Sequence, residues 1–184
     1  MNATGLKWTA ALAASVGVAA CIFGCASDRP VRVVDRRPGP IDRIGAMLDA
    51  WHAAAASADE QTYFSFFSGD DAVFMGTDAT ERWTVPEFKA YAHPFFERGR
   101  AWSFTGTDRH IVLGPSGDVA WFDEVVVTAE RGDWRGSGVV VKIDGRWKIA
   151  HYNLSLPIPN EVFDDVLTLI RAHETDEQPA DDDG

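Results

Sequence analysis

Polar residues that could do chemistry appear in the last long apolar segment of the chain, residues 146–156. We predict a strand there, and side chains alternate between the two faces of a strand. Trp147 and Ile149 are apolar and should lie deep, so the same alternation carries His151 and Asn153 onto the inner wall. There they could line a ligand pocket or donate a hydrogen bond to a developing oxyanion. The alternative interpretation is that His151 is a hydrogen-bonded core histidine.

Two adjacent carboxylates in the predicted strand 119–130 are the second candidates for chemistry. Asp123 shares one face with Trp121, and Glu124 shares the other face with Phe122. Both faces mix polar and apolar side chains, so the sequence leaves open which carboxylate points inward. We favour Asp123, together with Trp121, on the inner side.

The role of an inward Asp123 depends on its neighbours. A lone buried carboxyl group is a candidate general base or acid, because burial raises its pKa, whereas a carboxylate beside a guanidinium is a fixed anion. Arg135 begins the next predicted strand and could supply that guanidinium only across a long diagonal of the hairpin. If the protein is an enzyme, Asp123 is the expected base and His151 or Asn153 the expected donor. The sequence leaves open whether there is any reaction.

The remaining candidates are weaker. Among the large rings of the predicted strands, Trp102 is the first choice to line a ligand, because most of the others should fill the core. Glu81, beside Trp83, either forms a surface ion pair with Arg82, which we favour, or lies inward at the mouth of a pocket. The sequence has no histidine or cysteine spacing typical of metal sites, no nucleophile elbow and no phosphate-binding glycine loop, so we expect no metal and no cofactor.

Helical periodicity comes before the strands that must position these residues. Apolar residues at three- and four-residue spacing predict a helix over 41–57, and Asp59 can cap a short second helix. Thr84 and Glu87 have the spacing of a capping box, which predicts the start of a third helix. Pro94 should kink or shorten that helix, because proline removes an interior hydrogen bond.

Segments rich in β-branched and aromatic residues predict about six strands, over 72–75, 80–84, 101–113, 119–130, 134–143 and 146–156. The Asp144-Gly145 pair between the last two is a two-residue hairpin signal. This order predicts an α+β fold, in which a curved antiparallel sheet with a long C-terminal meander packs on three N-terminal helices.

The chain divides into five predicted segments: a signal peptide (1–24), an extended tether (25–40), the domain (41–160), a C-terminal helix (161–174) and an acidic disordered tail (175–184). Lys7 followed by an apolar run is typical of a secretory signal, and the residues before each cysteine resemble a bacterial lipobox. We favour Cys25 as the lipidated residue, with Cys21 as the alternative.

The net charge of −11 comes mostly from the C-terminal end, where nine acidic residues and one arginine follow Asn160. The body of the chain is only mildly acidic and has no cationic stripe, which excludes a nucleic-acid-binding module. Both cysteines lie in the N-terminal segment, which excludes a disulfide scaffold.

Four strings resemble the SnoaL-like branch of the nuclear transport factor 2-like superfamily: 74–83 (FMGTDATERW), 120–124 (AWFDE), 135–139 (RGSGV) and 145–155 (GRWKIAHYNLS). The resemblance implies a cone-shaped half-barrel closed by helices, with an apolar cavity at one end and homodimers formed through the outer sheet face. It says little about activity, because the superfamily includes isomerases, dehydratases, hydrolases and non-catalytic binders.

Three functions follow as hypotheses. The leading one is a cell-envelope lipoprotein, anchored by lipid on the periplasmic face of a bacterial membrane, that binds a small apolar or amphipathic molecule without an established reaction. The second is an enzyme of the isomerase or dehydratase type with Asp123 as general base. The third is a dimerisation or interaction module whose cone is filled. The expected pocket residues are Trp102, Trp121, Asp123, Arg135, His151 and Asn153.

Overall fold

The computed structural model describes residues 37–129 and 132–177 of the 184-residue chain. The predicted signal peptide, both candidate lipidation sites and most of the tether lie outside the described residues. The described part forms, in chain order, α1 (Pro40–Ala56), α2 (Glu60–Ser65), β1 (Val73–Met75), β2 (Arg82–Thr84), α3 (Val85–Glu97), β3 (Thr105–Leu113), β4 (Val119–Thr128), β5 (Gly132–Ile143), β6 (Arg146–Ser155), the 3₁₀ turn η1 (Asn160–Val162) and α4 (Phe163–Glu177).

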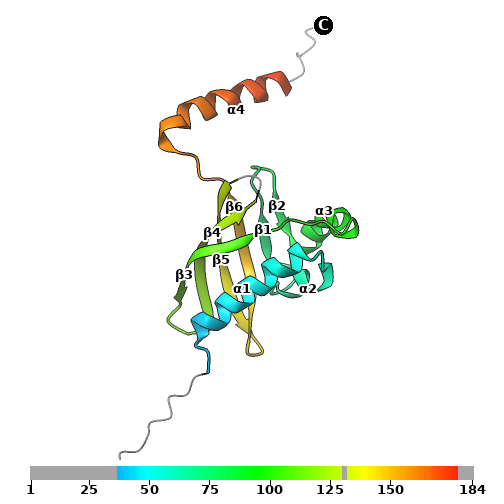
Figure 1. The fold of residues 1–184 in the computed structure, drawn as a ribbon, viewed down its shortest axis with the longest axis vertical. Coiled ribbons are helices and arrows are strands. Elements are labelled where there is room, and N and C mark those ends of the chain that lie inside the picture. The colour runs from blue at the N-terminus through cyan, green and yellow to red at the C-terminus, as the bar shows by residue number, and fades with distance from the viewer. Residues whose placement is uncertain (1–36, 130–131, 178–184) are drawn as a thin grey trace, which may run out of the picture. The chain divides into compact units, whose positions relative to one another are not determined.

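The strands form one six-stranded sheet in the order β2-β1-β6-β5-β4-β3. Strands β3 to β6 are an antiparallel meander, while β1 pairs parallel to β6 and antiparallel to β2 (Figure 1). The α+β class and the strand count are therefore confirmed, with the difference that the sheet is mixed. The parallel pairing is possible because the third helix and the meander separate β1 from β6 in the chain.

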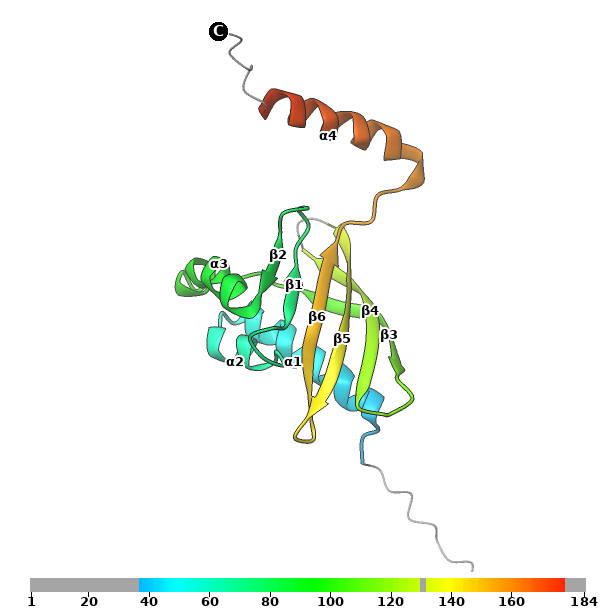
Figure 2. The ribbon, with the colours of Figure 1, turned by 180° about the vertical axis from the view of Figure 1, so that it is seen from behind.

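Helices α1, α2 and α3 lie on one side of the sheet, and α1 runs across the long strands (Figure 2). Ile44, Leu48 and Trp51 of α1 are buried, as their spacing predicts. Asp59 accepts a hydrogen bond from the backbone N–H of Thr62 at 3.0 Å, and thus caps α2 as expected.

Rings fill the deep interior between α1 and the sheet. Trp51 stacks on Tyr63 with ring centroids 5.2 Å apart and meets Tyr152 of β6 edge-on at 4.7 Å. Two glycines of β5 make room for these rings, because a Cβ at Gly136 would overlap the Tyr152 hydroxyl and one at Gly138 would overlap Phe122. The Gly136-Ser137-Gly138 string is thus explained by packing.

A β-bulge in β6 overturns the predicted alternation of its side chains. Val139 of β5 pairs with His151, but the next residue, Val140, pairs with Ile149, so one extra residue, Ala150, is inserted. Before the bulge Trp147 and Ile149 face the helices, as predicted; after it Tyr152 and Leu154 do. His151, Asn153 and Ser155 are consequently moved to the other face.

Helix α3 includes Pro94 and ends three residues after it, at Glu97. The bounds of the last helix need correction. Helix α4 runs to Glu177, three residues into the predicted tail, and none of its described side chains from Phe163 to Glu174 is buried. Among the described residues, no helix is both long and apolar enough to span a bilayer.

Candidate ligand-binding pocket

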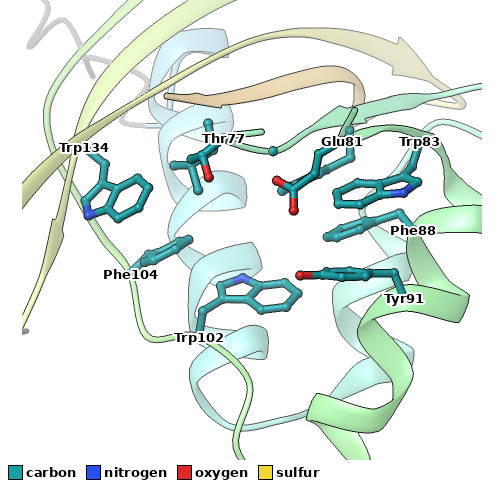
Figure 3. A pocket seen from close by; sticks show the side chains of 11 residues that line it. Thr77, Glu81, Trp83, Phe88, Tyr91, Trp102, Phe104 and Trp134 are labelled. Carbon is teal, nitrogen blue, oxygen red and sulfur yellow. The ribbon is translucent and has the colours of Figure 1, made fainter. Parts of the chain in front are cut away.

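A cavity of about 270 Å³ opens between the β1–β2 hairpin, α3 and the segment that leads into β3 (Figure 3). Its wall is mostly aromatic and consists of Phe74, Gly76, Thr77, Glu81, Trp83, Phe88, Tyr91, Trp102, Phe104, Trp134 and Leu154. Five elements and two connecting segments of the fold therefore contribute to one site. Only a chain already folded into sheet and helices brings these rings together.

The aromatic wall is a stack held in place by the capping of α3. The backbone N–H of Thr84 donates to Glu87 at 2.8 Å, which fixes the start of the helix that carries Phe88 and Tyr91. Phe88 stacks on Phe74 with centroids 3.8 Å apart. Trp83 of β2 stacks on Phe88 at 5.6 Å and on Tyr91 at 4.6 Å. Rings held in such layers change little on binding, which favours a preformed site.

Among the described residues of this wall, Glu81 is the one with a charged side chain. The hairpin turn is closed by backbone hydrogen bonds, in which Gly76 N–H donates to Glu81 O at 2.9 Å and Glu81 N–H donates to Asp78 O at 3.0 Å. The Glu81 side chain folds over Gly76, where an added Cβ would overlap its carboxylate. In Figure 3 the carboxylate points into the space bounded by Trp83, Tyr91 and Trp102. Of the two roles weighed for Glu81, the structure favours the pocket.

A second, more open hollow of about 570 Å³ adjoins the cavity. The two share Gly76, Thr77, Trp134 and Leu154. The hollow adds the following residues of the hairpin turn and of the chain at the end of β6: Asp78, Ala79, Asn153, Ser155, Leu156 and Ile158. A ligand larger than the cavity could extend into it.

A separate polar network lies behind the aromatic wall, in the core. Glu124 is 1% exposed, and its Oε1 lies 2.8 Å from Nε2 of His52, which is 3% exposed. Its Oε2 accepts a hydrogen bond from Nε of Arg109 at 2.7 Å. Burial by itself would raise the pKa of Glu124, but the hydrogen bonds and charges of His52 and Arg109 outweigh burial and hold that pKa below its usual value.

Arg109 connects this network to α1. Its Nη1 donates to the carbonyl of Gly45 at 3.0 Å and lies 2.9 Å from Oδ1 of Asp49. A register shift in β3 at Asp108, whose φ is +45°, separates Arg109 from the outward-facing side chains of the strand. Gly106 leaves the room that the ion pair needs, because a Cβ there would overlap both Glu124 and Arg109.

The network does not reach the cavity. None of its members lines the cavity. Phe104 does line it, and the centroid of its ring lies 6.4 Å from the centroid of the His52 ring. The Tyr152 hydroxyl, buried near Glu124, has no hydrogen-bond partner among the described residues, and burial followed by the charge of Glu124 raises its pKa well above the usual value. The arrangement fastens α1 to the sheet and offers no group to a ligand.

The residues predicted to form the pocket divide between three places. Trp102 lines the cavity, and Asn153 contributes only to the adjoining hollow. Trp121, Asp123, Arg135 and His151 lie on the sheet face that points away from the helices; Trp121 is 49% exposed, while His151 is half-buried.

The prediction of an inward Asp123 is wrong. Asp123 is exposed and pairs with Nδ1 of His110 at 3.3 Å, while Glu124 takes the inner position beside Phe122 and Val126. The cause is the network, because only the inner carboxylate can reach the donors on α1 and β3. With Asp123 and His151 both outside the cavity, the proposed base and donor have no enclosed space in which to act.

Sequence reasoning missed the network and most of the aromatic wall. One signal was available, because His52 follows Leu48 by four residues on the buried face of the predicted first helix. A histidine there needs a buried partner, and Glu124 was the open alternative to Asp123. Among the described residues, no group of three histidine, cysteine or carboxylate side chains could hold a metal ion.

Comparison of the structure with solved structures identifies the class of fold. A nuclear transport factor 2-like protein of unknown function from Pseudomonas putida KT2440 is similar over 65% of this chain and 87% of its own, with a TM-score of 0.54 and 16% identity. A protein from Novosphingobium aromaticivorans DSM 12444, provisionally named a scytalone dehydratase, is similar over 64% of this chain and 84% of its own, with a TM-score of 0.53 and 19% identity. A provisionally named dehydratase of the same class from Streptomyces avermitilis is similar over 65% of this chain and 96% of its own, with a TM-score of 0.54 and 14% identity.

The fold is therefore that of the nuclear transport factor 2-like class. Residues 44–159, more than half of the chain, match the SnoaL-like domain family, and the chain belongs to that family. No curated protein matches the chain.

Proposed function

We propose that this chain is a cell-envelope lipoprotein whose SnoaL-like domain binds a small organic molecule in the aromatic cavity. The observation that carries the proposal is a stack of rings, Phe74, Phe88, Trp83 and Tyr91, that stands open to a cavity of about 270 Å³ with one carboxylate in its wall. Aromatic walls with few polar groups are typical of ligand sites.

The size of the cavity restricts the ligand. Sites for drug-sized ligands usually measure about 300–1,000 Å³. The 270 Å³ cavity suits a small molecule, or one end of a longer molecule that continues into the adjoining hollow. The interior beyond the wall is occupied by Trp51, Tyr63 and Tyr152, so part of the filled-cone hypothesis is retained within the proposal.

Tryptophan fluorescence tests the binding site. The full chain in detergent solution is titrated with a panel of small aromatic, aliphatic and steroid compounds, and binding is checked by calorimetry. Trp102→Leu should weaken the binding of any hit at least tenfold, whereas Trp121→Leu, on the opposite sheet face, should leave it unchanged. Absence of any hit, or equal effects of the two substitutions, would contradict the proposal.

Anchoring is a separate part of the proposal and rests on the sequence alone. Cys25→Ala should abolish acylation and move the protein from the membrane fraction to the soluble fraction, while Cys21→Ala should leave both unchanged. Mass spectrometry of the mature N-terminal peptide provides the measurement. A lipidated peptide that begins at Cys21 would reverse the assignment.

The outer sheet face supports a homodimer as the assembly of the domain. Val112, Trp121, Val139 and His151 lie in one register row across four strands, and Val112 and Trp121 are 47% and 49% exposed. Trp121→Glu should therefore convert a dimer to a monomer, as measured by light scattering after size-exclusion chromatography. A wild-type mass of one chain would contradict this part.

A further inference from the structure

In the part of the chain that the structure describes, the cavity and the adjoining hollow have acidic and no basic side chains in their walls. Glu81 lines the cavity, Asp78 lines the adjoining hollow, and none of the described lysines, arginines or histidines lines either. Every other polar group of the cavity wall is neutral. The electrostatic potential set by these groups is negative, which favours a cationic ligand over an anionic one.

Glu81 and Asp78 differ in how far the protein already satisfies them. Oδ1 of Asp78 accepts hydrogen bonds from both the backbone N–H and the hydroxyl of Thr80, the first at 2.8 Å. Among the hydrogen bonds of the described residues, Oε2 of Glu81 accepts one, from the backbone N–H of Asp78 at 3.2 Å. None of the ion pairs among the described residues includes Glu81. Glu81 therefore retains most of its capacity to accept hydrogen bonds on the side that faces the cavity.

We propose that the cavity binds a small organic cation, namely a protonated amine on a flat apolar body, with Glu81 as its counter-ion. This inference rests on the proposed ligand binding and specifies its chemical class. The ammonium group would donate charge-assisted hydrogen bonds to the Glu81 carboxylate, and these are stronger than bonds between neutral groups. The apolar body would contact the rings of Trp83, Tyr91 and Trp102, which also attract a cation placed over their faces.

Neutral and anionic molecules of the same shape are disfavoured for a physical reason. A neutral body that enters the cavity removes water from the Glu81 carboxylate without replacing the lost hydrogen bonds by a compensating charge. An anionic body adds repulsion at short range. The same desolvation strengthens the interaction with an ammonium group, because the rings lower the local dielectric constant.

Three probes that differ mainly in charge test this inference: 2-phenylethylamine, 2-phenylethanol and 3-phenylpropanoate. Each is titrated into the full chain in detergent solution at pH 7, with tryptophan fluorescence and calorimetry as readouts. We expect the amine to bind at least tenfold more tightly than the alcohol, and the carboxylate to bind most weakly. An alcohol or a carboxylate that binds as tightly as the amine would overturn the inference.

The variant Glu81→Gln assigns the preference to one side chain. It keeps the shape of Glu81 and removes its charge, so the preference for the amine over the alcohol should disappear: the amine should bind more weakly than to the wild type, and the alcohol should bind no more weakly than before, because a neutral amide costs less to desolvate than a carboxylate. Asp123→Asn, an exposed carboxylate of the outer face, is the matched control and should leave the preference unchanged. A preference for the amine that survives in Glu81→Gln would also overturn the inference.

Failure of the cation inference can be distinguished from failure of the proposed ligand binding. If none of the three probes binds but another compound binds in a Trp102-dependent manner, the cation inference fails and the proposed function stands. If neither the probes nor any compound of the wider panel binds, both fail. A thermal melt of each variant verifies that it is folded, and the comparison of the three probes on the wild-type chain needs no variant.

Discussion

Glu124 and Glu81 both lie among aromatic side chains, yet they differ in burial and in how far neighbouring groups compensate their charge. Glu124 is fully buried. Its carboxylate lies 2.8 Å from Nε2 of His52 and accepts a hydrogen bond from the Arg109 guanidinium at 2.7 Å. Glu81 is half-buried and accepts one backbone hydrogen bond at 3.2 Å. Within the part of the chain that the structure describes, the charge of Glu124 is compensated and the charge of Glu81 is not. A compensated carboxylate stabilises the fold, whereas an uncompensated one at the edge of a cavity is available to a ligand.

The positions of the two residues fit these roles. Glu124 belongs to β4, in the middle of the meander, and its partners tie β3 and α1 to that strand. Glu81 belongs to the turn between β1 and β2 at the mouth of the fold. Groups in such turns can be chosen for binding without disturbing the core, because few buried contacts depend on them.

The largest effect is expected from removing the compensated charge. Glu124→Leu leaves Arg109 and His52 buried without their acceptor, and breaking a buried ion pair in this way costs about 3–5 kcal/mol. Urea denaturation, followed by circular dichroism, measures the free energy of unfolding. The neighbouring substitution Asp123→Asn is the control and should change that free energy by no more than about 0.5 kcal/mol. Equal stability of Glu124→Leu and the wild type would refute a structural role for the network.

Acidification should have a smaller effect in the same direction. The pKa of Glu124 is lowered in the folded state, so its ionisation adds stability above the pKa of an unfolded glutamic acid, about 4.3, and that stability is lost as the pH falls through the lowered value. The loss is smaller than for Glu124→Leu, because a protonated carboxyl group still occupies the space and accepts one hydrogen bond.

A comparison of two proteins separates Glu124 from the other titrating groups. Asp59, Asp78 and Glu87 also have lowered pKa values, because their hydrogen bonds to threonines favour the ionised form. Between pH 7 and pH 3 the wild type should therefore lose more unfolding free energy than Glu124→Gln, which keeps those three groups. Parallel pH dependence in the two proteins would mean that Glu124 makes no difference.

Much of the fold follows from local patterns in the sequence. Three- and four-residue spacing predicted α1 within one residue at each end, and the Asp144-Gly145 signal correctly placed the turn between β5 and β6. These features depend on neighbours along the chain. The parallel pairing of β1 with β6 does not, because two residues such as Phe74 and Tyr152 become neighbours only in the folded sheet.

The candidate site was predicted poorly because it depends on contacts between distant residues. The choice between Asp123 and Glu124 is decided by His52, which lies on a helix 72 positions away from Glu124. The position of His151 is decided by the bulge at Ala150, and an alanine gives no local sign of a bulge. Trp102 was predicted to line the ligand on composition alone, because the predicted strands carry more large rings than the core needs.

The smallest effect on stability is expected at Glu81, and this tests the comparison from the other side. Glu81→Gln removes a charge that no described side chain compensates and retains a carbonyl oxygen that can accept the Asp78 N–H. The free energy of unfolding should therefore stay within about 0.5 kcal/mol of the wild type. Measuring Glu81→Gln and Glu124→Gln side by side in urea gives the contrast directly, because the same chemical change is made at both positions. A loss at Glu81 as large as that at Glu124 would mean that the carboxylate holds the hairpin turn together, and the reason to regard it as free for a ligand would be gone.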